Sequence, residues 1–316
     1  MLKKLLTGAA ALSIAVTMAM ATEGIRFNVI QGNAEKPYMK MINEKIEDIG
    51  FVLSDPHERI NDAYKEKYGS TVLDNLGFFS ITNDESMREL LLKEPSLGGF
   101  SPFNLHIYKK NDENRTYVGH VMPNTMLDIV GVKDKKVREA FNAQFGPLDK
   151  LVQDSLGGKV EFTSYDKLPA KTMMRFEVPF DRPKDLSEFI DEFQEEFEGA
   201  FEENHYIIAG YKNFKETYTD LELPFDRYDA YWVYSLCHFK FSYSIFNTGR
   251  PEAGAFAPCS MYMYIEKGSN KLIVGMPLLQ NWIAVVGIKD KAKIEAMKKL
   301  DAEIIKIMKE MGAKEL

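Results

Sequence analysis

Apolar side chains in the first 160 residues switch between a two-residue and a three-to-four-residue period, and each switch predicts a new element. Ile25, Phe27 and Val29 alternate with polar residues, which is typical of a strand within 24–32. Apolar residues three and four apart then predict an amphipathic helix over 35–48. By the same reasoning we expect a strand that begins at 51 and further strands over 76–82, 103–109 and 116–121. Helices are expected over 60–68, 84–93 and 134–154, and an apolar turn over 123–130.

The later residues follow a similar order with longer elements. A β region is expected over 160–180, interrupted at Pro169, and then a helix over 185–204 whose phenylalanines recur at every fourth position. Such a stripe is typical of a face packed on a core. A short extended segment is expected over 206–209. A Tyr- and Trp-rich stretch over 228–246 alternates as a strand does, and a Lys-rich helix is expected over 290–311.

One stretch of the chain occurs twice. Gly98 to Asp134 contains Gly-Gly-Phe-Ser-Pro, an apolar strand, Val-Gly and then Val-Gly-Val-Lys-Asp. A segment 156 residues later, Gly254 to Asp290, contains Gly-Ala-Phe-Ala-Pro, Val-Gly and Val-Gly-Ile-Lys-Asp in register. Matches over that length indicate one supersecondary unit used twice. We therefore expect two tandem modules, 22–157 and 158–316, divided at Gly157-Gly158.

Each module reads as a strand, a helix, several antiparallel strands and a closing helix. This order predicts an α+β fold in which helices cover one face of a sheet, a two-layer sandwich. Two such modules in tandem would pack most economically as a pseudo-twofold pair, an internal version of a symmetric dimer. We expect a monomer with this internal pseudo-dimer, or a weak homo-oligomer.

The first 21 residues have the pattern of a signal peptide. Lys3 and Lys4 precede an apolar run from Leu5 to Met18, and Ala19-Met20-Ala21 supplies small residues before a cleavage point. The run is shorter than the ~20 residues that a membrane-spanning helix needs. We expect cleavage after Ala21, no transmembrane segment in the remainder, and a periplasmic location.

Composition excludes some partners. Hydrophobic residues make up 45% of the 316 residues and charged residues 28%, as in ordinary globular proteins. The formal net charge is −7 at pH 7, and Lys and Arg form no cluster. Nucleic acid and anionic membranes both require clustered basic side chains, so neither is an expected partner.

The chain resembles the family of the domain of unknown function 302 (DUF302). In the first copy the resemblance covers Gly50-Phe51, Leu90 to Pro95, and Pro102 through Asp134, and in the second it is clearest from Pro258-Cys259 onward. It implies a β-α-β4-α fold in each module, known in single and tandem forms, and no assigned activity. Family members often carry one cysteine in the middle strand and one in the Pro-Cys step. The second module has both, and the first has neither, since Phe103 follows Pro102.

Cys237 and Cys259 are the two cysteines of the chain. An even number in an exported protein favours a disulfide, and neighbouring strands would place their Cα atoms ~4.5–5.5 Å apart, which suits a bridge. Two buried free thiols are the second interpretation, and a redox-active or metal-binding pair is the third. His238 would point to the opposite face of a strand from Cys237, so no metal site or cofactor is predicted.

No catalytic signature stands out in the sequence. The glycines lack phosphate-loop spacing, and there is no His-Glu-x-x-His or EF-hand pattern. His106 and His120 lie on the two strands of one expected hairpin, where we expect core or surface histidines rather than a joint site. We therefore lean away from an enzyme.

The aromatic stretch is the remaining candidate for a site. It forms either plain sheet core or an apolar pocket where the two modules meet. The candidate pocket residues are Tyr231, Trp232, Phe239, Phe241 and Tyr243. The leading hypothesis is non-enzymatic binding of a small apolar ligand or a protein partner at that contact. The alternative is a thiol-based redox or metal-handling protein that uses Cys237 and Cys259.

Overall fold

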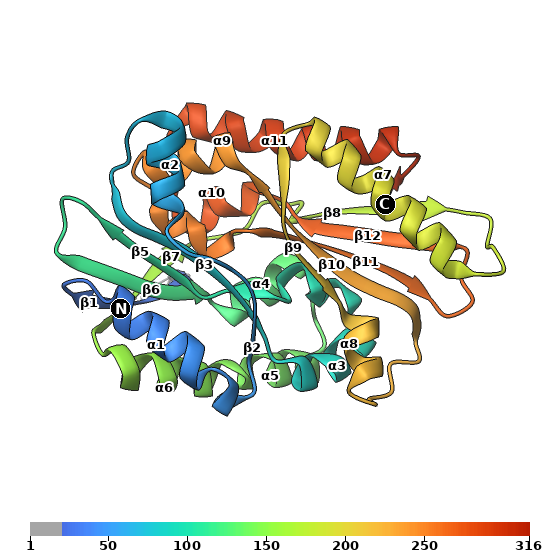
Figure 1. Ribbon diagram of the computed structural model, residues 1–316, viewed down its shortest axis with the longest axis horizontal. Coiled ribbons are helices and arrows are strands. Elements are labelled where there is room, and N and C mark those ends of the chain that lie inside the picture. Colours follow the sequence, from blue (N-terminus) through green and yellow to red (C-terminus); the bar gives the residue numbers. More distant parts are fainter. Residues whose placement is uncertain (1–20) are drawn as a thin grey trace, which may run out of the picture.

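The computed structural model describes residues 21–316, which form two antiparallel sheets flanked by helices (Figure 1). The predicted α+β class and the two repeated modules are confirmed. The predicted signal peptide falls, apart from Ala21, outside the described residues. Within 21–316, no helix combines the length and the apolar character needed to cross a membrane.

The N-terminal half spans 22–165. Its strands are β1 (Thr22–Gln31), β2 (Val52–His57), β3 (Leu73–Thr82), β4 (Phe103–Asn104), β5 (His106–Lys110), β6 (Arg115–Val121) and β7 (Lys159–Tyr165). Its helices are α1 (Glu35–Lys45), α2 (Ile60–Tyr68), α3 (Asp84–Lys93), α4 (Pro123–Val130), α5 (Lys135–Ala143) and α6 (Phe145–Leu156), with 3-10 turns η1 (Glu47–Ile49) and η2 (Pro95–Phe100). The sheet order is β2-β3-β5-β6-β1-β7, and β4 pairs with β3.

The C-terminal half spans 173–315. Its strands are β8 (Met173–Pro179), β9 (Tyr206–Asn213), β10 (Tyr228–His238), β11 (Cys259–Glu266), β12 (Lys271–Pro277) and β13 (Lys314–Glu315). Its helices are α7 (Leu186–Glu203), α8 (Phe214–Asp220), α9 (Phe239–Ser242), α10 (Gln280–Val286) and α11 (Lys291–Glu310), with a π-helical turn η3 (Tyr243–Asn247) and a 3-10 turn η4 (Pro251–Phe256). The order β9-β10-β11-β12-β8-β13 repeats that of the first sheet.

The first sheet extends beyond the predicted boundary at Gly157-Gly158. Strand β7 follows these glycines and pairs with β1, with Lys159 opposite Val29. Strand β13 does the same in the C-terminal half, where it pairs with β8. The closing strand therefore returns to the first strand in both halves, and the sheets divide between Tyr165 and Met173 rather than at the glycines.

The helix expected over 134–154 is two helices, α5 and α6, separated at Gln144. Asp134 caps the first, because its side chain accepts hydrogen bonds from the backbone of Lys136 and Val137. Pro147 explains the restart. It has no amide hydrogen to continue the helix from Ala143, and its fixed φ suits the first turn of α6 instead.

Equivalent residues of the two halves are separated by a nearly constant number of positions, and that number changes once along the chain. The peptide bonds Ser101-Pro102 and Ala257-Pro258 are both cis and lie 156 residues apart. Asn83 and His238 both cap the helix after the third strand and lie 155 residues apart. The extra residue falls in the interval that contains the π-helical turn η3, and such a turn accommodates one additional residue.

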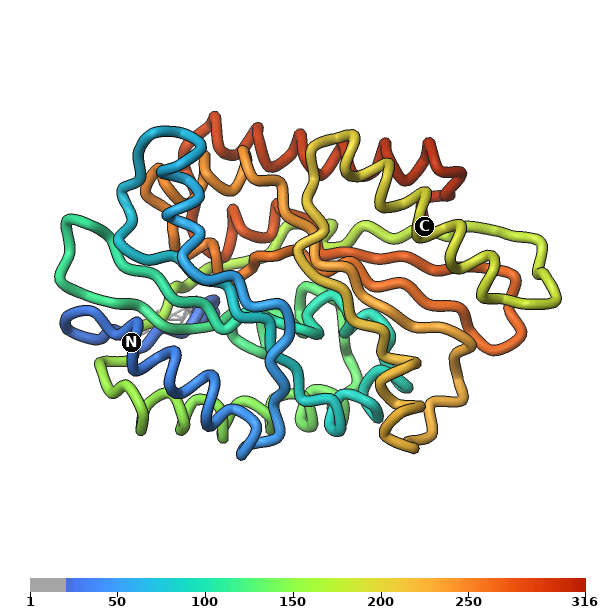
Figure 2. The backbone as a smooth tube through the Cα atoms, in the orientation of Figure 1, coloured from blue at the N-terminus to red at the C-terminus, as the bar shows by residue number. Residues whose placement is uncertain are grey.

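The halves pack reciprocally, as expected for a pseudo-twofold pair. Turn η2 lies on β11 and β12, and its counterpart η4 lies on β5 and β6. The hydroxyl of Tyr231 donates to the Pro95 carbonyl at 2.6 Å, and the His106 ring lies 2.8 Å from the Pro251 carbonyl oxygen. Strands β2 and β9 run side by side through the middle of the molecule (Figure 2). We call this contact region between the halves the seam.

One helix from each half crosses the seam. Helix α2 lies beside α9, where Tyr64 packs on Phe239 with ring centroids 5.0 Å apart. Helix α8 lies beside α3, where the Tyr218 hydroxyl donates to the Asp84 carbonyl at 2.9 Å. Figure 1 shows these two pairs at opposite ends of the seam. Each half therefore supplies part of the other's helical layer.

Candidate functional site

The five aromatic residues predicted for a pocket do not converge on one place. Tyr231 faces the seam, whereas Trp232 lies on the opposite face of β10 in the core beneath α7 and α11. Phe239 and Tyr243 pack against the tyrosines of α2. Phe241 lines a small cavity in the C-terminal half. The alternating pattern did not show that β10 ends at His238 and a helical turn begins there, so the later residues leave the sheet.

Cys237 and Cys259 are free thiols, not the disulfide that their number favoured. The physical reason is register, because Leu236 and not Cys237 stands opposite Cys259. Both thiols nevertheless line the same cavity of about 30 Å³. The lining residues are Tyr206, Leu236, Cys237, His238, Phe241, Ser242, Phe246, Ala257, Cys259, Met276, Leu279, Trp282, Leu300 and Ile304. We call it the thiol cavity.

Burial controls the chemistry of these two thiols. It raises the pKa of Cys237 to about 11, offset in part by a hydrogen bond from Ser242. It raises the pKa of Cys259 further, and the neighbouring Cys237 adds to this shift. Buried thiols with raised pKa values are poor nucleophiles. Both thiols are therefore protonated at neutral pH.

The thiol cavity exists because large side chains of the N-terminal half have smaller or polar counterparts here. In the N-terminal half, Phe103 packs against Phe145 and Phe51 with ring centroids 4.8 and 5.9 Å away. At the positions of Phe103 and Phe145, 156 residues later, stand Cys259 and Asp301. An aromatic cluster thus fills one half, and its counterpart leaves space.

Asp301 is a buried carboxylate beside this space. It is 2% exposed and accepts hydrogen bonds from the backbone of Leu279 at 2.8 Å and of Gln280 at 3.2 Å, at the start of α10. Burial raises the pKa of Asp301 to about 6, against the lowering effect of these hydrogen bonds. Its role is to hold α10, which carries Trp282 to the cavity wall.

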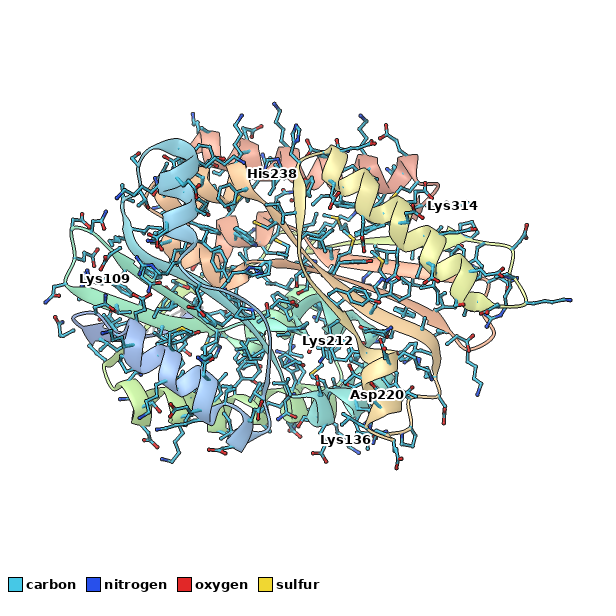
Figure 3. All side chains as sticks on the ribbon, in the orientation of Figure 1. Lys109, Lys136, Lys212, Asp220, His238 and Lys314 are labelled. Carbon is cyan, nitrogen blue, oxygen red and sulfur yellow. The ribbon has the colours of Figure 1, made fainter. Side chains whose placement is uncertain are left out.

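A larger groove of about 610 Å³ opens at the seam next to the thiol cavity. Its lining residues are Lys67, Tyr68, His205, Tyr206, Ile207, His238, Phe239 and Lys240. The first two come from α2 of the N-terminal half and the others from the C-terminal half. Tyr206 and His238 line both spaces. Figure 3 labels His238 at this place, near the junction of β10 and α9. We call it the seam groove.

The seam groove combines ring faces with positive charge. The rings of Tyr68 and Phe239 stack with centroids 6.0 Å apart, and Ile207 beside them is 47% exposed. The Nζ atom of Lys67 lies 5.0 Å from the Phe239 ring centroid, and Lys240 stands at the next position in the chain. No Asp or Glu is among the lining residues of the groove.

The equivalent place on the other side of the pseudo-twofold has acidic residues where the seam groove has Phe239 and Lys240. With Asn83 matched to His238, the counterparts of Phe239 and Lys240 are Asp84 and Glu85. Asp84 is paired there with Lys212 at 2.9 Å, and both side chains are nearly buried. The positive groove is therefore a property of one copy and not of the shared fold.

The two candidate histidines form no joint site. His106 pairs in register with Gly119, so His106 and His120 face opposite sides of the hairpin. Each is buried and makes its own contacts, His106 with the Gly77 and Pro251 carbonyls and His120 with Asp149. Burial lowers the pKa of His106 to about 4. Across residues 21–316, no three His, Cys, Asp or Glu side chains converge in a way that would hold a metal ion.

Comparison with known proteins adds one structural likeness. No protein-family model and no curated protein matches the chain. Among solved structures, the chain is similar to the crystal structure of an uncharacterized conserved protein DUF302 from Bacillus stearothermophilus. The TM-score is 0.34 and the identity 15%, over 42% of this chain and 94% of that chain. The comparisons assign no activity to the chain.

Proposed function

We propose that this protein binds a small organic anion with an aromatic or apolar body in the seam groove, without catalysing a reaction. The observation that carries the proposal is the lining of the groove, which has two lysines and no acidic side chain; the carboxylate of Glu303 acts on Tyr206 and His238 from outside the lining. The chain as a whole has a net charge of −7. A local positive concavity on an acidic protein attracts anions selectively.

The size and the walls of the groove support the class of ligand. Its volume of about 610 Å³ lies within the range of ~300–1,000 Å³ typical of small-molecule sites. The half-buried rings of Tyr68 and Phe239 and the exposed side chain of Ile207 would receive the apolar body of the ligand. Lys67 and Lys240 would meet its anionic group from opposite halves, so binding would also bridge the seam.

The proposal also includes the domain organisation and the location of the protein. The element order common to both halves supports two DUF302-like modules, and the leader pattern of residues 1–21 supports export to a periplasm. A ligand taken up there would be a metabolite of low molecular mass rather than a nucleic acid. The groove binds the ligand, and helices α2 and α9 position the two lysines.

The test is a fluorescence titration with 8-anilinonaphthalene-1-sulfonate, an aromatic anion of suitable size. We expect saturable binding at one site per chain. The double variant Lys67→Gln, Lys240→Gln should bind about tenfold more weakly, since exposed charge pairs contribute up to ~1 kcal/mol each. Lys65→Gln, two residues away on α2 and outside the groove, is the matched control and should bind as the wild type does.

Two results would contradict the proposal. One is probe binding that is equal in the double variant and in Lys65→Gln, which would place the probe elsewhere. The other is no saturable binding to the wild type. Measuring the titration at low and high salt adds a second criterion, because an electrostatic contribution from the lysines weakens as salt rises.

A further inference from the structure

Three sulfur-containing residues line the thiol cavity. Cys237 comes from the end of β10, Cys259 from the start of β11 and Met276 from β12, and all three residues line the same space. The thiols lie close enough for Cys237 to shift the pKa of Cys259. Trp282 closes another side of the cavity, stacked on Phe256 with ring centroids 5.7 Å apart.

The size of the cavity selects its occupant. A space of about 30 Å³ holds one or two water-sized bodies, because a single water needs ~10–15 Å³ on this measure. An organic ligand of several heavy atoms does not fit. The lining is chiefly apolar, and water in such a cavity lacks partners. A single ion that bonds directly to sulfur is the occupant that matches both properties.

We propose that the thiol cavity binds one soft monovalent d10 cation, of the Cu(I) or Ag(I) class, through Cys237, Cys259 and Met276. Thiolate and thioether sulfur are the donors that such cations prefer over the oxygen and nitrogen donors of harder metals. His238 is not a donor here. Its Nδ1 accepts a hydrogen bond from the Phe241 amide at 3.2 Å, which leaves the proton on the other ring nitrogen.

Charge balance decides the protonation of the site. Metal binding requires a deprotonated thiol and releases its proton. When one thiol loses its proton, a sulfur electron pair forms the bond to the cation and the proton leaves to solvent, so the complex is neutral. Loss of both protons would leave a net negative charge in an apolar site, beside the buried Asp301. The expected release is therefore one proton per cation.

The N-terminal half is a built-in comparison. The counterparts of Cys237, Cys259 and Met276 are Thr82, Phe103 and His120. Phe103 occupies the equivalent space there and packs on Phe145. No sulfur stands at any of these three positions. The proposed site is therefore confined to one half, and the stoichiometry is one cation per chain.

The experiment uses Ag(I), which is not oxidised by air, added to the reduced full-length protein in excess free methionine. The free methionine competes with isolated methionine side chains, of which the chain has 16 including Met1. Native mass spectrometry should show one Ag(I) per chain. In a Trp232→Phe background, the remaining Trp282 should be quenched on binding.

Variants distinguish the proposed donors from bulk methionine. Met276→Leu conserves volume and should weaken Ag(I) binding about tenfold or more. Met263→Leu, buried in the same sheet but away from the cavity, should leave it unchanged. Cys259→Ser removes one of the two thiols and should weaken binding more than Met276→Leu does. If Cys259→Ser fails to fold, the comparison of Met276→Leu with Met263→Leu still tests the proposed site.

The proposal fails if the wild type holds no Ag(I) against free methionine, or if Met276→Leu and Met263→Leu bind equally. It also fails if silver binds and Trp282 is not quenched, because the cation then lies elsewhere. These outcomes are independent of the seam groove, since none of the three sulfur residues lines it.

Discussion

Cys259 and Phe103 occupy equivalent positions, and the difference between them separates a cavity from a filled core. The Phe103 ring contacts Phe145 and His120 in the N-terminal half. Cys259, with a far smaller side chain, leaves space that Asp301 does not fill. Comparing the two copies therefore gives a control that a single-domain protein would not offer.

His106 gives a pH prediction at the scale of one residue. It is 0% exposed, and burial lowers its pKa to about 4, below the ~6.5 of an unfolded chain. Because the depressed pKa favours the neutral ring in the folded state, its contribution to stability is complete above pH 6.5. That contribution is lost as the pH falls from 6.5 towards 4. Between pH 7 and pH 5 the loss should be about 2 kcal/mol.

Urea unfolding of the wild type and His106→Gln at both pH values measures this loss. The stability of the wild type relative to the variant should decrease by that amount at pH 5. His205→Gln, which changes an exposed histidine, is the control for general pH effects. A difference between wild type and His106→Gln that is the same at pH 7 and pH 5 would show that His106 does not titrate as described.

At the scale of elements, the reciprocal 3-10 turns join the halves. Gly254 of η4 approaches His106 so closely that an added Cβ atom would lie 2.6 Å from His106 Cε1. Gly254→Ala should therefore displace η4 from the first sheet and destabilise the protein by about 1–3 kcal/mol, the range for overpacking. Gly199→Ala in α7 meets nothing within 4 Å and should be neutral or stabilising by up to ~1 kcal/mol.

Thermal unfolding of the two glycine variants tests this prediction. Since the turns tie the halves together, Gly254→Ala should lower the midpoint of a single transition. If Gly254→Ala is as stable as Gly199→Ala, the close packing of η4 on the first sheet is wrong.

Periodicity and capping residues predicted most elements and missed those that depend on long-range contacts. The helix starting near Asp134 and the strands before and after it follow from local signals. That β7 belongs to the first sheet does not follow from local signals. Its polar-rich sequence is stabilised by pairing with β1, 130 residues away in the chain. The π-helical turn η3 was also not predicted, since the alternating pattern assigned its residues up to Phe246 to the strand, which ends at His238.

At the scale of the whole molecule, the sites arise from the packing of two copies. The repeat and the α+β class follow from matches in register, which need no knowledge of packing. The seam groove does not. Lys67 and Lys240 carry no local signal, and they meet only because α2 of one half lies against α9 of the other. One sequence difference does point to the groove, because Lys240 stands where the other copy has Glu85.

A crystal structure of the protein with 8-anilinonaphthalene-1-sulfonate bound tests the seam groove most directly. We expect the aromatic body of the probe to lie against Tyr68 and Phe239, with its sulfonate within hydrogen-bond distance of Lys67 or Lys240. Density for the probe at another exposed apolar position, such as Val72 or Phe162, with the seam groove empty, would contradict it.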